Sequence, residues 1–415
     1  MRALLLLLLV ATAPALADDG DAAALLLADK TATTAEQSGD WRVYVEAAAR
    51  EARRQGPGLA LQGARLSIDA RFDKTFAPGW RAVFADRLDM IRMDGVSGNR
   101  DINTLKEAYL SWQAQPDRVA DLGRINARNG VALGYNPTDY FRAGALRSTV
   151  SIDPASLREN RLGSAMLRGQ ALWNGGSLTA LYSPKLADRP SDAVFSPDFG
   201  ATNRRARWLV ALSEKLSDAL NPQWLLSGGT GESPQLGLNL TALPNDATVA
   251  YFEWSGGRAS SLAAQALVSR DDPAFRSRLS TGLTYTTPSK VSLTAEYQYN
   301  GAGLDQAGWN ALRRGPPAAY GLYRGLVTSI QDPPTRHNVF LYAVWQDALV
   351  RHLDLTVMLR YDATDHSRLQ WLEARYHWTR VDIALQTQLN TGQPGSNYGA
   401  LPERRLWQAS IRYYF

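Results

Sequence analysis

Segments of about ten residues, in which apolar and polar side chains alternate, run through most of the chain. In the segment 405–415, apolar side chains recur at every second position from Trp407 to Phe415, with polar side chains between them. The segments 291–299 and 353–361 repeat this pattern. An alternation with a period of two predicts β-strands that present one apolar face and one wet face.

The length of these segments favours a membrane protein over a soluble one. Strands of soluble proteins average five or six residues, whereas about ten tilted residues cross a bilayer. Aromatic residues such as Trp371, Tyr376 and Trp378 gather near segment ends, as in the aromatic girdles of membrane barrels. A lipid-embedded backbone without long helices satisfies its hydrogen bonds only in a closed sheet. The sequence therefore predicts an all-β fold, a transmembrane, antiparallel, up-and-down β-barrel.

Nineteen segments qualify as candidate strands, although single-chain bacterial barrels normally have an even number. Counted from either end of the chain, short turns and long loops alternate until the two counts collide between residues 205 and 276. One candidate in that region is therefore expected to be wrong; the candidates there are 205–214, 223–230, 234–243, 247–255 and 260–268. We predict about 18 strands, within a range of about 16 to 20, with long loops at 128–162, 185–204 and 301–336.

The first 17 residues have the pattern of a secretory signal peptide. Arg2 supplies the positive charge, Leu4 to Val10 form a short apolar run, and Ala15-Leu16-Ala17 is a small-x-small cleavage site. The apolar run is too short to span about 30 Å of hydrocarbon as a helix. We predict a cleaved signal peptide (1–17), a short periplasmic N-terminal segment (18–40) and a barrel over 41–415.

Composition narrows the possible partners and chemistry. The chain has no Cys, which excludes thiolate metal sites and Cys nucleophiles, and its 45 basic and 40 acidic residues almost cancel. We therefore expect no nucleic-acid partner. The four His residues show no ligand spacing, so neither a metal site nor another cofactor is expected.

The last six residues, Ser410 to Phe415, resemble the terminal strand of bacterial outer-membrane proteins. In that group a final Phe after alternating aromatic residues is read by the barrel-assembly machinery. The resemblance implies a location in the cell outer membrane of a Gram-negative cell, with Phe415 as the assembly signal. It also implies contact with the lipid bilayer, with lipopolysaccharide and with the assembly machinery.

A second stretch of some twenty residues, from Leu122-Gly123-Arg124 to Phe141, resembles porin-like channels, including some related to the alginate-export group. It departs from their pattern at Ile125, where a Gln is expected. Its Asn-Pro-Thr-Asp turn lies in the predicted loop 128–162, which either folds inward as a constriction or lies outside as a surface loop. The candidate constriction residues are Arg128, Asn129, Asn136, Asp139 and Arg142.

Charged residues on the polar face of the predicted strands supply the candidate channel lining. These residues are Arg65, Arg71, Arg168, Arg278, Arg360, Arg375, Arg412, Glu296, Asp354 and Glu373. One interpretation is that Arg–carboxylate pairs across strands hold the wall together. The other is an Arg ladder that guides anionic solutes, because guanidinium binds carboxylate and phosphate in a fork geometry.

The function that these features favour is a non-enzymatic outer-membrane channel for small hydrophilic, anionic solutes. A dedicated exporter of a polysaccharide or lipid-linked product, working with periplasmic partners, is one alternative. A closed structural or enzymatic barrel is the second. Asp362, Asp365 and His366 lie together in one hairpin, but an outer-membrane protease needs acids and a His that converge from several strands. We therefore name no catalytic residue.

Overall fold

The computed structural model describes residues 40–55, 60–94, 100–217, 219–268 and 271–415. The predicted signal peptide and residues 18–39 lie outside the described residues. The first strand begins at Trp41, where the sequence places the start of the barrel.

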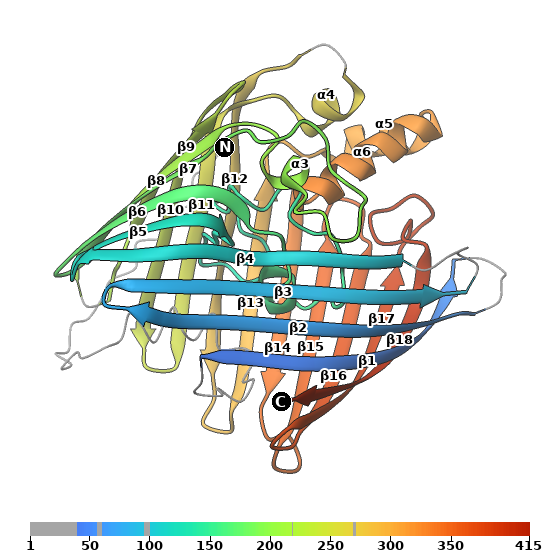
Figure 1. Cartoon of the computed structure of the whole chain (residues 1–415). Helices are drawn as coiled ribbons and strands as arrows, with labels where there is room; N and C mark the ends of the chain where they lie inside the picture. Colours follow the sequence, from blue (N-terminus) through green and yellow to red (C-terminus); the bar gives the residue numbers. More distant parts are fainter. Residues whose placement is uncertain (1–39, 56–59, 95–99, 218, 269–270) are drawn as a thin grey trace.

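Eighteen antiparallel strands form one closed sheet (Figure 1). They are β1 (Trp41–Arg54), β2 (Leu61–Ala77), β3 (Trp80–Met93), β4 (Arg100–Gln115), β5 (Arg118–Ile125), β6 (Ser164–Trp173), β7 (Gly176–Ser183), β8 (Arg207–Glu214), β9 (Gln223–Gly229), β10 (Glu232–Asn245), β11 (Thr248–Ala259), β12 (Ala274–Thr286), β13 (Val291–Asn300), β14 (His337–Trp345), β15 (Leu353–Asp362), β16 (Arg368–His377), β17 (Val381–Thr391) and β18 (Glu403–Tyr414). Each strand pairs with its neighbours in sequence, and β1 also pairs with β18. The predicted fold class, strand number and up-and-down topology are confirmed.

The candidate strand 260–268 is wrong. Residues Leu262–Leu267 form helix α4, and the Ser261 hydroxyl caps it by accepting a hydrogen bond from the Ala264 backbone N–H at 3.1 Å. The helix buries Leu262 against Trp309 instead of placing it in the wall. The error falls between residues 205 and 276, where the two strand counts collide.

The two faces of the sheet differ as a membrane barrel requires. On β13 the outward side chains Leu293 and Tyr297 are 46% and 40% exposed, whereas the inward Glu296 is buried. Trp80 and Trp112 stack on the outer face beside short turns, with ring centroids 5.9 Å apart. Within the described residues, no helix has both the length and the apolar composition to cross a membrane. The apolar outer face and polar lumen are those of an outer-membrane β-barrel.

The wall is uneven in height. Strands β1 to β4 contain between 14 and 17 residues, whereas β5 to β9 contain between 7 and 10. Because β5 is short, its pairing with β4 ends at Ala108 opposite Arg124. Beyond that point the loop after β7 approaches β4, and the Asn103 N–H donates to the Val194 carbonyl at 3.3 Å. Arg147 ties this region together by donating to four backbone carbonyls.

Short turns and long loops lie at opposite ends of the barrel. The C-terminus lies at the end with the short turns, and the helices α3 (Phe199–Thr202), α4, α5 (Gln306–Arg314) and α6 (Pro317–Ile330) lie at the other end (Figure 1). Bacterial barrels place short turns in the periplasm, so the long loops face the outside. We call the two ends the turn end and the loop end. Phe415 lies at the turn end, where its N–H donates to the Val43 carbonyl at 3.1 Å; its role in assembly stays a prediction.

Candidate functional site: the loop-crossed lumen

The chain between β5 and β6, residues 126–163, contains the predicted loop 128–162 and is fastened to the inner wall by two buried glutamates. The first is Glu253 on β11, whose carboxylate accepts hydrogen bonds from the backbone N–H groups of Val131, Ala132 and Thr138 at 2.9, 3.0 and 2.8 Å. A buried backbone N–H needs a hydrogen-bond acceptor, and for these three groups Glu253 supplies it. Glu253 therefore acts as an anchor for the loop.

The second anchor is Glu296 on β13. Its carboxylate accepts from the backbone N–H groups of Leu133, Gly134 and Tyr135 at 3.0, 3.1 and 3.0 Å. Gly134 allows this close approach, because a Cβ atom there would lie 2.6 Å from the Phe340 ring. The sequence predicts Glu296 as a channel-lining residue; it does face the lumen, but its carboxylate is occupied by the loop.

The loop then crosses to the opposite wall through the short helix α2 (Pro154–Glu159). At the start of the helix, the Tyr342 hydroxyl of β14 donates to Asp153 at 2.7 Å. At its end, Glu159 lies 2.7 Å from Arg42 of β1 and 4.0 Å from Lys106 of β4. Burial by itself raises the pKa of Glu159, but Lys106 and Arg42 outweigh it and lower that pKa to about 2. The loop thus spans the lumen between two walls.

The predicted constriction residues divide into two groups. Asn136 donates to Glu253 at 3.1 Å, Asp139 lies 2.6 Å from Arg161 of the same loop, and Arg142 pairs with Asp332 of the loop 301–336. These three hold the loop in shape. Arg128 and Asn129 instead line a cavity on the turn side of the loop. The loop lies inside the barrel; that it limits conductance stays a prediction.

Most of the predicted arginine lining is paired with carboxylates. The ion pairs are Arg65–Glu46 at 2.5 Å, Arg71–Glu107 at 2.6 Å, Arg168–Asp121 at 2.6 Å, Arg278–Asp332 at 3.2 Å, Arg375–Glu373 at 2.9 Å and Arg412–Glu46 at 2.8 Å. Arg360 differs: its guanidinium lies 5.2 Å from the centroid of the Phe340 ring and donates to the Gly134 carbonyl at 3.4 Å. Six of the seven arginines are therefore neutralised by a carboxylate. Four of these pairs, those of Arg65, Arg71, Arg168 and Arg412, join different strands and favour the wall-bracing interpretation.

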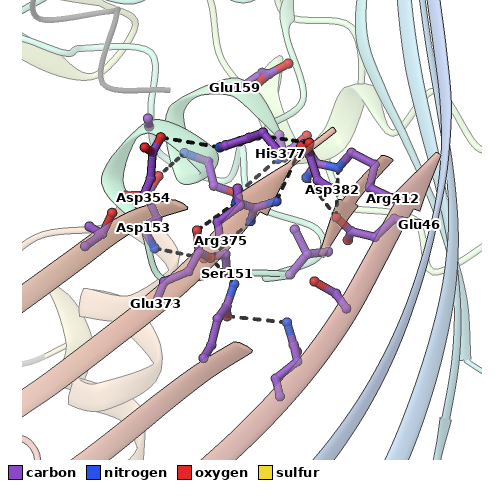
Figure 2. Close-up of a pocket in the computed structure, with 18 of the residues that line it drawn as sticks. Glu46, Ser151, Asp153, Glu159, Asp354, Glu373, Arg375, His377, Asp382 and Arg412 are labelled. Carbon is purple, nitrogen blue, oxygen red and sulfur yellow. Dashed lines mark hydrogen bonds and ion pairs between the residues drawn. The ribbon is translucent and has the colours of Figure 1, made fainter. Parts of the chain in front are cut away.

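A cavity of about 130 Å³, which we call the acidic basin, lies between α2 and strands β1, β2 and β14–β18 (Figure 2). Its charged side chains are Glu46, Asp153, Glu159, Asp354, Glu373, Asp382, Arg42, Arg65, Arg375, Arg412 and His377. His377 bridges two carboxylates, with Nδ1 2.9 Å from Asp382 and Nε2 3.3 Å from Asp354. The predicted residue Asp354 is thus part of a network in which charges compensate each other.

Two other cavities lie on the far side of α2. The outer basin, about 290 Å³, opens toward the loop end between α2, α6 and β15, and its charged side chains are Arg142, Arg158, Arg161, Arg324, Arg360, Asp139 and Asp332. The inner basin, about 470 Å³, lies toward the turn end between β2, β4–β6 and β8–β11. Its charged side chains are Arg71, Arg128, Arg158, Arg168 and Glu107. Both carboxylates of the outer basin are paired with arginines. The charges without an opposite partner in these two basins are therefore, among the described residues, those of arginine side chains.

Several important lumen residues were not predicted. Glu253 lies on the polar face of the candidate strand 247–255, where a single acid among apolar residues could have drawn attention to it. Arg158 and Arg324 lie on helices inside long loops, and no alternation marks such positions. Asp362, considered with Asp365 for catalysis, accepts instead from the Thr364 backbone N–H at 3.0 Å and from the Thr335 hydroxyl at 2.7 Å. Within the described residues, no group of three or more acids and histidines could hold a metal ion.

The comparisons with known proteins bear on the fold. No family model and no curated protein sequence matches the chain. Among solved structures it is similar to Acinetobacter baumannii OccAB1 (TM-score 0.57, 11% identity, 90% of this chain and 96% of that one). It is also similar to Pseudomonas aeruginosa OccK7 (OpdD) (0.55, 11%, 91% and 99%) and OccK5 (OpdH) (0.54, 11%, 91% and 98%). The chain has the fold of a porin-like outer-membrane channel.

Proposed function

We propose that the protein is a channel in the outer membrane for small hydrophilic solutes, and that it prefers anions. The observation that carries the proposal is the set of arginines in the outer basin that pair with no carboxylate. Within the described residues, Arg158, Arg324 and Arg360 take part in no ion pair, and Arg324 donates only to Asn397. A lumen with low-dielectric walls focuses the field of such charges and concentrates anions.

The geometry also supports a limit on solute size. The anchored loop leaves basins of about 290 and 470 Å³ on one side of α2, which suit a small solute better than a polymer chain. Selection would rest on width and lining charge, without covalent chemistry. The paired arginines of the wall add little net field, so we expect a weak preference for anions and not a strict one.

Planar-bilayer recording tests this function. The purified protein should produce discrete conductance steps, and its reversal potential under a KCl gradient should show weak anion selectivity. Replacing residues 131–160 by a short Gly-Ser linker should raise the conductance while the barrel keeps its heat-modifiable mobility in detergent. A protein that inserts but conducts nothing would support the closed barrel instead, and a cation-selective wild type would reject the anion preference.

A further inference from the structure

Helix α2 separates two environments inside the barrel. Pro154, Leu157 and Arg158 line the outer basin, whereas Asp153 and Glu159 line the acidic basin. Over the described part of the chain, the acidic basin shares no lining residue with the outer basin or with the inner basin. A six-residue helix therefore carries opposite charges on its two sides and acts as a partition.

Arg158 lies where the outer and inner basins meet. Among the residues that the structure describes, it alone contributes to the lining of both cavities. The outer basin opens toward the loop end and the inner basin toward the turn end. A solute that moves from one to the other along this side of α2 therefore passes the Arg158 side chain.

No carboxylate among the described residues holds the guanidinium of Arg158 in place. Within the described residues it takes part in no ion pair, and its buried Nε has no hydrogen-bond partner. The backbone carbonyl of Arg158 accepts from Asn126 at 3.0 Å, and Asp153 caps the helix by accepting from the Ser156 N–H, also at 3.0 Å. The helix is thus held in place without this side chain. Burial lowers the pKa of Arg158 below the ordinary value, since the nearby Asp139 offsets only part of the lost hydration.

We propose that Arg158 is the specificity-determining residue of the channel: anionic solutes pass between the outer and inner basins across its guanidinium, and the acidic basin is not on their route. This inference rests on the proposed function. An uncompensated guanidinium can exchange its hydration for a passing carboxylate or phosphate oxygen, whereas one already bound to Asp or Glu cannot do so without breaking that pair. Arg324 and Arg360 lie on the outer side of this point and Arg128 on the inner side.

The test compares Arg158 with an arginine on the other side of the partition. Arg158→Gln and Arg158→Glu are measured beside Arg375→Gln, which removes a positive charge from the acidic basin (Figure 2). The readouts are the reversal potential under a KCl gradient and the swelling rate of proteoliposomes in sodium acetate. We expect Arg158→Gln to bring the anion-to-cation permeability ratio to about one and Arg158→Glu to reverse the preference. Arg375→Gln should leave the ratio within about 20% of the wild type.

The outcomes separate this inference from the proposed function. A wild type without conductance rejects the channel itself. A conducting wild type whose selectivity responds to Arg375→Gln as much as to Arg158→Gln rejects the one-sided route and leaves the channel function standing. Heat-modifiable mobility in detergent is recorded for every variant, so that a misassembled barrel is not mistaken for a change of selectivity. Arg158→Lys should keep the sign of the preference, because the charge at the partition remains.

Discussion

Two arginines, Arg412 of the barrel wall and Arg158 of the inward loop, stand in opposite electrostatic situations. Arg412 on β18 lies directly across from Glu46 of β1 in the sheet register, and their side chains are 2.8 Å apart. Arg158 on the loop helix faces two cavities and has no carboxylate partner within the described residues. The same side chain therefore braces the structure in one region and is free to meet a solute in the other.

The difference follows from how each region is built. A β-sheet fixes every side chain at a register position, so an acid and an arginine on facing positions meet without further help. A loop imposes no such pairing, and its charges are compensated only where a specific contact exists, as in Arg161 with Asp139. Of the three outer-basin arginines without a carboxylate partner among the described residues, Arg158 and Arg324 accordingly lie in loops, and Arg360 lies on β15.

The largest effect is expected from releasing the loop from its anchors. Replacing both Glu253 and Glu296 by Ala removes acceptors for six backbone N–H groups, and each unsatisfied buried donor costs about 1–3 kcal/mol. We expect the loop to leave the lumen and the single-channel conductance to rise at least about twofold, since the partition is lost. Gln at both positions keeps one carbonyl oxygen at each anchor and should give an intermediate conductance. A double Ala variant with wild-type conductance would show that the loop does not limit flow.

Much of the wall could be predicted from the sequence because apolar outward and polar inward side chains alternate along each strand. The inward face of β2, with Arg65 and Arg71, follows from that alternation alone. The failed candidate 260–268 shows the limit of the signal. Its short run of Ser, Ala and Leu fits either structure, and packing of Leu262 under α5 and α6 decides for a helix.

The lumen was harder to predict than the wall. The resemblance and the turn in 136–139 drew attention to the loop, but not to the glutamates that hold it, because these lie more than one hundred residues further along the chain. Whether an arginine is paired depends on contacts that form only when the barrel closes. Sequence alternation therefore identified candidates for the lining but did not separate bracing arginines from free ones.

The second-largest effect is expected on thermal stability, and it compares a wall residue, Glu46, with a loop residue, Arg158. Glu46 lies within hydrogen-bonding reach of Arg65, Arg412 and Arg87. Arg87 keeps Asp89 at 3.0 Å, but Glu46→Ala leaves Arg65 and Arg412 without a carboxylate partner within the described residues. Breaking a buried ion pair costs about 3–5 kcal/mol, and we expect the heat-modification midpoint to fall clearly. Arg158→Ala should leave that midpoint within error of the wild type. Equal losses in the two variants would contradict the division of roles.

A smaller effect should separate two arginines that sequence alone places in one class. Arg360 has no carboxylate partner within the described residues, whereas Arg375 lies 2.9 Å from Glu373. In reversal-potential measurements we expect Arg360→Ala to weaken anion selectivity and Arg375→Ala to change it little. The double variant should then resemble Arg360→Ala. A dominant effect of Arg375 would restore the wall arginines as the selective element.

The smallest effect is a pH dependence of the far loop anchor, Glu159. Its pKa is lowered from 4.5 to about 2, because Lys106 and Arg42 outweigh the effect of burial. A carboxyl whose pKa is lowered in the folded state stabilises that state above its ordinary pKa and loses this contribution as the pH falls toward the lowered value. The contribution of Glu159 to holding the loop should therefore be constant between about pH 8 and 5, and the gating noise that its loss causes should appear as the pH falls from about 4.5 toward about 2.

Two features keep this effect small and make it separable from others. The surrounding wall removes part of the hydration of Glu159, but 47% of its side chain is still exposed, so water screens its pairing with Arg42. Asp153, at the other end of α2, has its pKa raised by burial, so it takes up a proton at a higher pH than Glu159 does. Glu159→Gln isolates the anchor, since it removes the titrating group but keeps its size. This variant should show increased gating noise already at pH 7, and acidification should add no further increase from this site. A variant with no more gating noise than the wild type at pH 7 would mean that Glu253 and Glu296 hold the loop without Glu159.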